Sequence, residues 1–449
     1  MPEDLSARVN NFAIYLPAVQ FESARRLADM SKPLRTDGLP YGLQTSDFDW
    51  LDQDNKYWRY KWCLASAGHF AEKKRANVIT NRHKDTIVVG DSGGYQIATG
   101  ALSEAKDWAQ HRQDTKQIMQ LWEESQARHT IKDWMDTHSD YAMTIDMPLW
   151  VQGKKNEKTP FHYLSEGQLT QLTISNLQLI DGHRNRESGC KYLNVLQAFA
   201  KDGTQQTSLD SEDRWFDAVK QFTFEGWSLG GEVGVRGGIS RVLRRLLILR
   251  DHRLLESPYE WCHVLGVSTP LWAVFLTAIQ RAIRAYTNPE FTISYDSASP
   301  YLTAGRYNRY VTAPKFGTDI SNWGIADEAL PTGYGYANSG MNDLLLGASP
   351  IGKFFTIQDF NPRSGSFDIK TTDALSDAVL VNHNVYVYVK SMIEANEATF
   401  LRRQAPDELL RAVSVIDKLF AAKDWKPLLD THRGNLDAVV GGYDSEFER

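Results

Sequence analysis

Short apolar runs alternate with longer helical segments over about the first 300 residues, and this alternation most limits the folds open to the chain. Each run is rich in aliphatic or aromatic residues and is followed by a polar residue or a glycine. Between the runs, apolar residues recur every 3.6 positions or so in Lys106–Arg128, Glu166–Asn185, Glu212–Phe222 and Leu271–Tyr286, which predicts helices there. Strands and helices in alternation predict parallel strands joined by crossover helices.

Eight runs fit this pattern, and eight strands favour a closed (β/α)8 barrel over an open sheet. The count includes the first two runs, in which the strand signal is weakest. We therefore expect an α/β protein with a TIM barrel and insertions over residues 1–300. The predicted strands are Asn11–Ala18, Lys61–Ser66, Thr86–Asp91, Tyr141–Asp146, Tyr192–Gln197, Gly226–Gly231, Cys262–Val267 and Phe291–Asp296.

The alternation ends after about residue 300. Tyr301–Phe367 is rich in Gly, Asn, Ser, Thr and Pro, so we expect long loops and small irregular elements there. Helical periodicity then returns and predicts Thr372–Val379, His383–Asn396, Pro406–Leu419 and Trp425–Thr431. Residues 301–449 are therefore expected to form irregular loops and helices packed on the barrel, not an independent domain.

The overall composition excludes several classes of protein. Hydrophobic residues make up 42% and charged residues 24% of the chain, as in ordinary globular proteins, which excludes a disordered or fibrous chain. No apolar run approaches the ~20 residues of a membrane span, and the segment MPEDLSARVN lacks a signal-peptide core. Three cysteines lie far apart in the sequence, which fits a reducing compartment. We expect a cytoplasmic protein with no membrane partner.

A barrel of this kind carries its functional groups at the carboxyl ends of its strands. Predicted strands end on Asp91, Asp146, Gln197 and Asp296, and another ends on the pair Gly230–Gly231. A single acidic residue after a strand is often only the N-cap of the next helix. All of these residues together indicate a polar site on one rim of the barrel.

The segment DSGGYQ, Asp91–Gln96, is the strongest local signal. Two glycines directly after a strand let the backbone approach a flat ligand closely. Tyr95 offers a stacking face, and Ser92 and Gln96 offer hydrogen bonds. An ordinary strand-to-helix turn also uses paired glycines, so the residues by themselves allow both interpretations.

DSGGYQ after TIVVG resembles the signature of the tRNA-guanine transglycosylases, barrel enzymes that exchange guanine for a 7-deazaguanine. Five further segments are similar to strand ends of this family, in the same order: YAMTIDMP, YLNVLQAF, GWSLGGEVG, HVLGVSTP and FTISYDSASP. The resemblance spans about Asn11–Pro300, with a fainter similarity at Val381–Ala395. DSGGYQ is specific, whereas the other segments are weak one by one and gain weight from their shared order.

The resemblance implies catalytic roles for two carboxylates. Asp296 would be the nucleophile at C1′, and Asp91 would protonate the departing base. These roles suit the chemistry, because displacing a purine needs a nucleophile for the sugar carbon and an acid for the leaving group. Asp146 would accept hydrogen bonds from N1–H and the exocyclic amine of guanine. Such a polar site rejects adenine, which would leave buried groups unpaired.

The resemblance also implies how the base would be enclosed. Tyr95 would stack on one face of the base, and Leu265 would cover the opposite face. Gln197 and backbone groups of Gly230 and Gly231 would contact the O6 and N7 edge.

Two departures from the family pattern matter. The family's zinc site combines a cysteine cluster with a histidine; His383 matches the histidine, but no cysteine follows Cys262. One histidine cannot build a tetrahedral zinc site, so we expect no metal and no cofactor, and we interpret His383 as a hydrogen-bonded histidine at a helix start. The family's Pro-Thr-Arg, which helps hold tRNA, is here Pro300-Tyr301-Leu302, so its arginine is missing.

The contacts with nucleic acid remain open at this stage. The formal net charge is −6, so a nucleic acid must be bound through a local basic patch. Arg306 and Arg309 either replace the missing arginine or are solvated loop charges. The aromatic residues from Phe48 to Trp62 either belong to the core or stack on bases. Two basic clusters either bind phosphates or lie on solvated helix faces: Arg241, Arg244, Arg245, Arg250 and Arg253, and Lys73, Lys74, Arg75 and Arg82.

The leading hypothesis is a pentosyltransferase that replaces guanine in DNA with a 7-deazaguanine derivative, such as 7-cyano-7-deazaguanine, through a covalent aspartyl intermediate. The missing zinc cysteines and the long irregular segment make the chain resemble the DNA-acting branch of the family, found in phages and bacteria. Its partners would be DNA and the free 7-deazaguanine base, its location the cytoplasm (of the host, if phage-encoded), and a homodimer is one option for its assembly.

Two alternatives stay open. The first is a tRNA-guanine transglycosylase that modifies tRNA in the manner of queuosine or archaeosine synthesis. The second is a non-catalytic paralogue that only binds nucleic acid. The presence of Asp91, Asp146 and Asp296 argues against the second alternative, since a protein without the chemistry has no need of all three.

Overall fold

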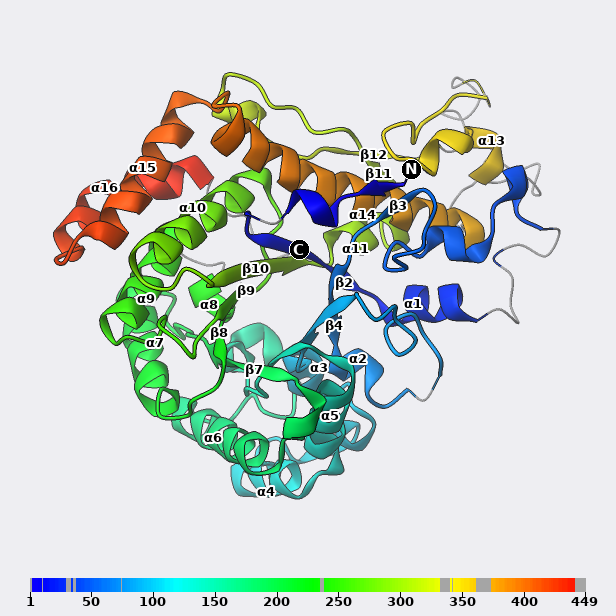
Figure 1. The fold of residues 1–449 in the computed structure, drawn as a ribbon. Coiled ribbons are helices and arrows are strands. Elements are labelled where there is room, and N and C mark those ends of the chain that lie inside the picture. The colour runs from blue at the N-terminus through cyan, green and yellow to red at the C-terminus, as the bar shows by residue number, and fades with distance from the viewer. Residues whose placement is uncertain are drawn as a thin grey trace.

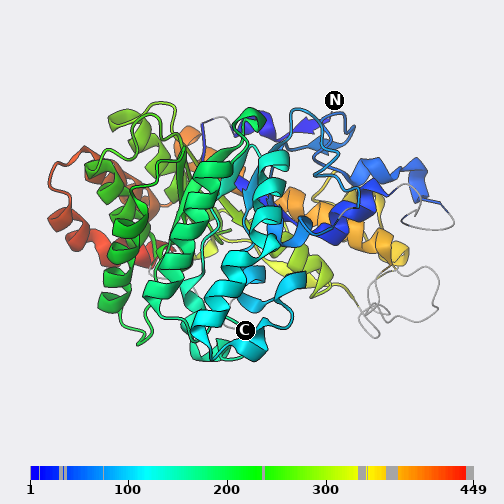
Figure 2. The same cartoon turned by 90° about the horizontal axis from the view of Figure 1, so that it is seen from below.

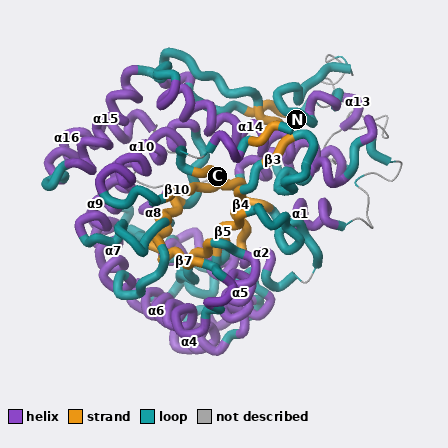
Figure 3. Tube along the Cα trace, in the orientation of Figure 1, coloured by secondary structure: helices purple, strands orange, loops and turns teal. Residues whose placement is uncertain are grey.

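Eight parallel strands form a closed barrel at the centre of the computed structural model (Figures 1 and 3). Their order around the barrel is β10-β2-β4-β5-β6-β7-β8-β9. The strands are β2 (Ile14–Val19), β4 (Trp62–Ser66), β5 (Ile87–Asp91), β6 (Tyr141–Met143), β7 (Lys191–Leu196), β8 (Gly226–Leu229), β9 (Trp261–Val264) and β10 (Thr292–Ser297). The structure describes residues 2–9, 11–29, 34, 38–73, 75–234, 238–331, 340, 342–360 and 373–440.

Each of the eight predicted runs overlaps one strand of the barrel, so the predicted (β/α)8 fold is confirmed. The runs are apolar throughout because a barrel strand is covered on one side by helices and on the other by the barrel interior. All six residues of β2 are buried, for example. Consecutive strands pair in parallel from β4 to β10, and β10 closes the barrel on β2.

Helices surround the barrel and lie side by side along its outside (Figures 1 and 2). The first is α1 (Phe21–Ala28). Among the described residues, no helix is both long and apolar enough to cross a membrane. The others up to β10 are α2 (Ala67–Phe70), α3 (Gly94–Thr99), α4 (Thr115–Glu124), α5 (Gln126–His138), α6 (Glu166–His183), α7 (Gln205–Val219), α8 (Gly231–Gly234), α9 (Gly238–Asp251) and α10 (Pro270–Tyr286).

The prediction of one helix over Lys106–Arg128 is wrong. The chain first makes short 3-10 turns, and α4 begins only after Asp114, whose side chain accepts a hydrogen bond from the backbone N–H of Gln117. Ser125 then takes an extended conformation, with φ −70° and ψ 142°, and separates α4 from α5. Apolar spacing alone does not detect such a break, because the apolar face continues across it.

The C-terminal region completes the helical layer. It contains α11 (Ser299–Gly305), α13 (Ile357–Phe360), α14 (Ala374–Asn396), α15 (Asp407–Ala421) and α16 (Lys426–Val440). In Figure 1, α14 passes beside β2, and α15 and α16 lie against α10 and α9. Arg26 of α1 forms an ion pair with Asp377 of α14 at 2.8 Å, so α14 bridges the flank of the barrel between α10 and α1.

One prediction for this region needs correction. Thr372–Val379 and His383–Asn396 were expected as separate helices, but α14 is continuous from Ala374. Its middle holds buried Asn382 and Asn384, whose side chains bond to the surrounding chain. Tyr301–Phe367 contains α11, α13 and a hairpin of β11 (Arg309–Val311) and β12 (Asp327–Ala329), while its residues 332–339, 341 and 361–367 lie outside the described residues.

Aromatic rings fill the amino end of the barrel. Tyr141 and Trp261 stack with their ring centroids 4.1 Å apart, and Trp62 packs against Trp261 at 6.1 Å. Below them, the Tyr141 hydroxyl and the Lys191 ammonium both donate to Oε1 of Glu260, at 2.7 and 2.5 Å. We call these five residues the barrel floor.

Candidate active site

Three carboxylates lie together at the carboxyl end of the barrel. Asp91 ends β5, Asp296 lies near the end of β10, and Asp146 follows β6. The strands run parallel around the closed barrel, so these three residues lie at the same rim, and a Cβ on Gly94, in the turn after Asp91, would lie 3.9 Å from Oδ1 of Asp146. The predicted convergence of these three residues on one rim is therefore confirmed.

The surroundings of these carboxylates shift their protonation. Burial raises the pKa of Asp146 to about 7, and the negative charge of Asp91 adds to the shift. Burial also raises the pKa of Asp91, with the charge of Asp296 adding to it. A carboxyl group that keeps its proton close to neutral pH can serve as a general acid.

Asp296 is held by donors from β9 and the loop after it. Asp296 is buried, with only 8% of the residue exposed. Oδ1 accepts from the backbone N–H of Gly266 at 2.9 Å and lies 3.2 Å from Nε2 of His263. Sequence reasoning missed His263, because a single histidine inside an apolar strand carries no signal of its own.

Gln197 bonds directly to Asp146. Its Nε2 donates to Oδ2 of Asp146 at 2.8 Å and to the carbonyl of Met147 at 3.0 Å. Its Oε1 accepts from the backbone N–H of Leu149 at 2.8 Å. Both amide hydrogens are thus in use, and Gln197 orients Asp146 in this arrangement.

The turn in DSGGYQ requires glycine at Gly93. Its φ of +83° is left-handed, and a Cβ there would lie 2.5 Å from the Cα of Gly68. Ser92 is buried, and Nε2 of Gln96 lies 2.7 Å from Nε2 of His69 on α2. Gln96 therefore contacts the helix behind the turn.

Tyr95 is placed differently from its neighbours in the turn. It is 60% exposed, and its ring stacks on Trp150 with centroids 6.0 Å apart. A tyrosine supported from behind and exposed in front is suited to stack on a planar ligand.

The glycine pair after β8 lies next to Gln197 and Leu265. The N–H of Gly230 donates to the carbonyl of Leu196 at 2.8 Å. A Cβ on Gly230 would lie 3.0 Å from Cδ1 of Leu265, and one on Gly231 would lie 3.7 Å from Cβ of Gln197. The structure thus brings these four residues together on one side of the rim.

The two arginines after β10 are in unequal positions. Arg306 is exposed, with its guanidinium 5.5 Å from the ring centroid of Tyr307. Arg309 forms an ion pair with Asp327 across the β11–β12 hairpin. Arg306 keeps an accessible charge, whereas the charge of Arg309 is compensated within the fold.

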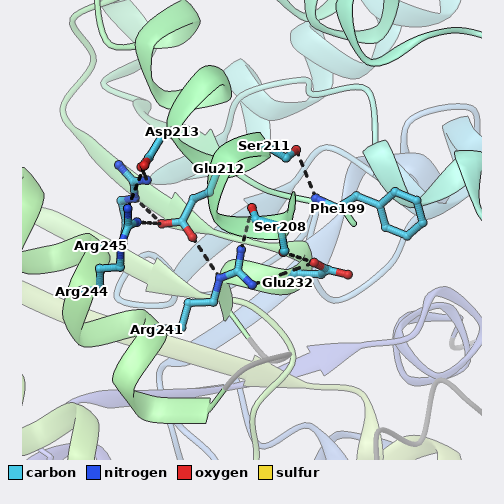
Figure 4. Close-up of polar contacts among 9 residues, drawn as sticks. All are labelled: Phe199, Ser208, Ser211, Glu212, Asp213, Glu232, Arg241, Arg244 and Arg245. Atoms are coloured by element: carbon cyan, nitrogen blue, oxygen red, sulfur yellow. Dashed lines mark hydrogen bonds and ion pairs between the residues drawn. The ribbon is translucent and has the colours of Figure 1, made fainter. Parts of the chain in front are cut away.

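Both interpretations of the arginine cluster between the sixth and seventh strands fail for Arg241 and Arg245. Their side chains are buried in an ion-pair cluster, shown in Figure 4. Arg241 and Arg245 bond to Glu212 at 2.9 and 2.5 Å, and Arg245 also reaches Asp213 at 2.8 Å. Sequence spacing showed the arginines but not the acids on α7 that neutralise them. Among the five arginines between the sixth and seventh strands, Arg253 has a largely exposed side chain, at 81%.

The other groups considered for nucleic-acid contacts are mostly part of the fold. Arg82 pairs with Asp140 at 2.9 Å, and Lys73 lies over the ring of Phe21. Lys74 lies outside the described residues. Among the early aromatic residues, the core interpretation is confirmed for four that are buried: Phe48, Trp50, Trp58 and Tyr60.

His383 is hydrogen-bonded through both ring nitrogens. Nδ1 lies 2.9 Å from Oγ of Ser349, and Nε2 lies 2.8 Å from the carbonyl of Val311. Burial lowers the pKa of His383 to about 4. The interpretation as a hydrogen-bonded histidine is confirmed, although it lies in the middle of α14 and not at its start. Within the described ranges, no group of three or more His, Cys, Asp or Glu side chains is placed to hold a metal ion.

The chain matches no protein-family model and no curated protein. What its site can do must therefore be inferred from the residues and their geometry.

Proposed function

We propose that the protein is a base-exchange transglycosylase that replaces guanine in DNA with a 7-deazaguanine derivative, such as 7-cyano-7-deazaguanine. The observation that best supports this proposal is the trio Asp91, Asp146 and Asp296 at one barrel rim, in unequal surroundings. Asp296 accepts a hydrogen bond from the N–H of Gly266, whereas burial and the charge of Asp296 raise the pKa of Asp91, and a nucleophile paired with a general acid requires such a difference.

The first half of the reaction removes guanine. A carboxylate oxygen of Asp296 bonds to C1′ while the bond from C1′ to N9 breaks and its electron pair goes to the base. Asp91 donates its proton to the departing base, so guanine leaves neutral. The sugar is then held as an ester of Asp296.

The second half reverses these steps with a different base. The incoming 7-deazaguanine loses its N9 proton to the Asp91 carboxylate, and N9 bonds to C1′. The bond between C1′ and Asp296 breaks, and the carboxylate is restored. Protons and electrons balance over the two halves, so no oxidant or reductant is consumed.

Base recognition follows from the remaining residues of the site. The Asp146 carboxylate accepts from N1–H and the exocyclic amine, groups that guanine and 7-deazaguanine share. Tyr95, supported by Trp150, stacks on one face of the base, with Leu265 on the other. The N–H of Gly230 already donates to the carbonyl of Leu196, so the contact with the O6 edge is assigned to the N–H of Gly231.

The choice of DNA over tRNA rests on the sequence. No cysteine follows Cys262, and Pro300-Tyr301-Leu302 replaces the arginine-containing segment of the tRNA enzymes. In a duplex the target guanine must be flipped out of the stack, at a cost of a few kcal/mol. Three free, buried cysteines suit a reducing cytoplasm, of a bacterial host if the chain is phage-encoded.

A single labelling experiment separates the candidate functions. The protein is incubated with a labelled 7-deazaguanine base and either DNA or tRNA, and the nucleic acid is digested to nucleosides. Label in a DNA nucleoside is the expected result. Label in tRNA alone would reassign the substrate, and binding without label in either would favour the non-catalytic paralogue.

A further inference from the structure

A chain of hydrogen bonds runs through the barrel interior from its floor to Asp296. Nε1 of Trp261 donates to Oγ of Ser294 at 2.7 Å, and this oxygen lies 2.8 Å from Nδ1 of His263. Nε2 of the same imidazole lies 3.2 Å from Oδ1 of Asp296. Ser294 and His263 are completely buried, so water does not compete for these bonds.

The chemistry of the groups fixes the direction of this chain. An indole N–H can only donate, so Ser294 Oγ accepts from Trp261. If the hydroxyl of Ser294 then donates to Nδ1 of His263, every proton has an acceptor and Nε2–H faces the carboxylate. The opposite tautomer would turn a lone pair of Nε2 toward the carboxylate of Asp296 and leave the Ser294 proton unpaired at a buried site.

Building on the proposed function, we propose that His263, as the neutral Nε2–H tautomer, is a positioning residue for the nucleophile Asp296. It donates to Oδ1 together with the N–H of Gly266, and these two donors fix the carboxyl plane. Oδ2 is left to attack C1′. Ser294 and Trp261 act through His263, because they select its tautomer.

The same arrangement gives the two neighbouring carboxyl groups different tasks. Two donors, Nε2–H of His263 and the N–H of Gly266, hold the carboxylate of Asp296 in place. The charge on Asp296 in turn helps the proton to stay on Asp91, whose pKa is raised by burial and by this charge.

Nitrogen NMR tests the tautomer directly. The whole protein is labelled with ¹⁵N-histidine, and the His263 signals are assigned by their loss in His263→Gln. We expect a protonated Nε2 and an unprotonated Nδ1 near neutral pH. A protonated Nδ1, in either the other neutral tautomer or the imidazolium ion, would overturn the proposal. In Ser294→Ala, the preference for the Nε2–H tautomer should weaken.

Two amide variants test the positioning role. The Gln nitrogen reaches the place of Nε2, so His263→Gln should keep kcat within a few-fold of the wild type. Asn is one methylene shorter than Gln, so in His263→Asn the amide should still bond to Ser294 but not reach Asp296. We therefore expect kcat to fall by about 100-fold with an unchanged KM for the base. Equal kcat values for the two variants would contradict the role.

A matched control separates positioning from stability. His383 is also buried and bonded through both nitrogens, but it lies on α14 away from the carboxylates. His383→Gln should lower the unfolding midpoint without changing kcat. The NMR result does not depend on turnover, so a wild-type protein inactive on both DNA and tRNA would refute the proposed function while the tautomer is still decided.

Discussion

The amide of Gln197 and the carboxylate of Asp146 are joined by a hydrogen bond of 2.8 Å. The other amide hydrogen donates to the carbonyl of Met147, and the amide oxygen accepts from the backbone N–H of Leu149. The amide therefore cannot turn without breaking a hydrogen bond. The resemblance implied that Gln197 reads the O6 and N7 edge of the base. In the structure it holds Asp146, the carboxylate that would read the N1 edge in the proposed reaction, and a contact with O6 would require one of these bonds to be exchanged.

The first prediction concerns base affinity. Asp146→Asn keeps the size of the side chain but replaces an acceptor oxygen with a donor. The affinity for free guanine or 7-deazaguanine should fall by about 10- to 100-fold, the value of hydrogen bonds to a charged group. Calorimetric titration with the free base measures this change. Asp54→Asn, at an exposed position, should bind as the wild type does.

The second prediction is the pH dependence of this site. Burial and the charge of Asp91 raise the pKa of Asp146 from 3.8 to about 7, so base affinity should rise as pH increases through about 7. Stability should change in the opposite direction. The folded state holds the proton more tightly than the unfolded state, so this group's contribution is greatest below about pH 4 and declines until about pH 7.

Asp146→Asn removes that decline. Its stability relative to the wild type should therefore improve from about pH 4 to about pH 8 in urea unfolding. A constant difference between the two proteins over this range would contradict the raised pKa of Asp146.

The third prediction concerns the nucleophile. Asp296→Ala should abolish guanine release while DNA binding stays close to that of the wild type, because a buried carboxylate is not a group that would bind phosphate. Release of labelled guanine and a gel-shift titration measure the two properties. Exchange at a near wild-type rate would exclude Asp296 from the covalent step.

The fourth prediction concerns the buried ion-pair cluster. Glu212 lies between the guanidinium groups of Arg241 and Arg245. Glu212→Gln leaves two buried positive charges with less compensation and should cost about 3–5 kcal/mol of unfolding free energy. Asp217→Asn removes an exposed pair with Lys220 and should cost about 1 kcal/mol or less. Similar losses in the two variants would contradict the burial of the cluster.

The fifth prediction concerns zinc. Protein purified without chelators should contain well below one zinc per chain, because no cysteine is available to join His383 and its ring nitrogens already contact Ser349 and Val311. Metal analysis checks this. One tightly held zinc per chain would show that a ligand set of another kind exists.

The barrel strands and the three carboxylates were predictable because both depend on short, contiguous stretches of sequence. A strand covered on both sides is a short apolar run, and Asp91, Asp146 and Asp296 stand at or just beyond the ends of such runs. His263 was not predictable, because its role depends on β10 lying beside β9 and placing Ser294 and Asp296 on either side of the imidazole.

Other errors have the same physical origin. The arginines of α9 looked like a free basic face, since their acidic partners lie about 30 residues earlier on α7. The two helices predicted as Thr372–Val379 and His383–Asn396 left a gap at residues 380–382, and the polar residues Asn382 to Asn384 lie at its end. They are the buried side of α14, where Asn382 reaches the Trp58 indole and Asn384 the backbone of Val311.

The barrel floor closes the amino end of the barrel and leaves access to the site from its carboxyl end. Trp62, Tyr141 and Trp261 pack across the amino end, so in the proposed reaction a base would reach Asp296 from the carboxyl end, where the nucleic acid would bind. In the proposed reaction, guanine must leave the pocket before 7-deazaguanine can occupy it, while the sugar stays bonded to Asp296. Such an enzyme should obey ping-pong kinetics, with parallel lines in double-reciprocal plots, and excess free guanine should compete with the replacement base.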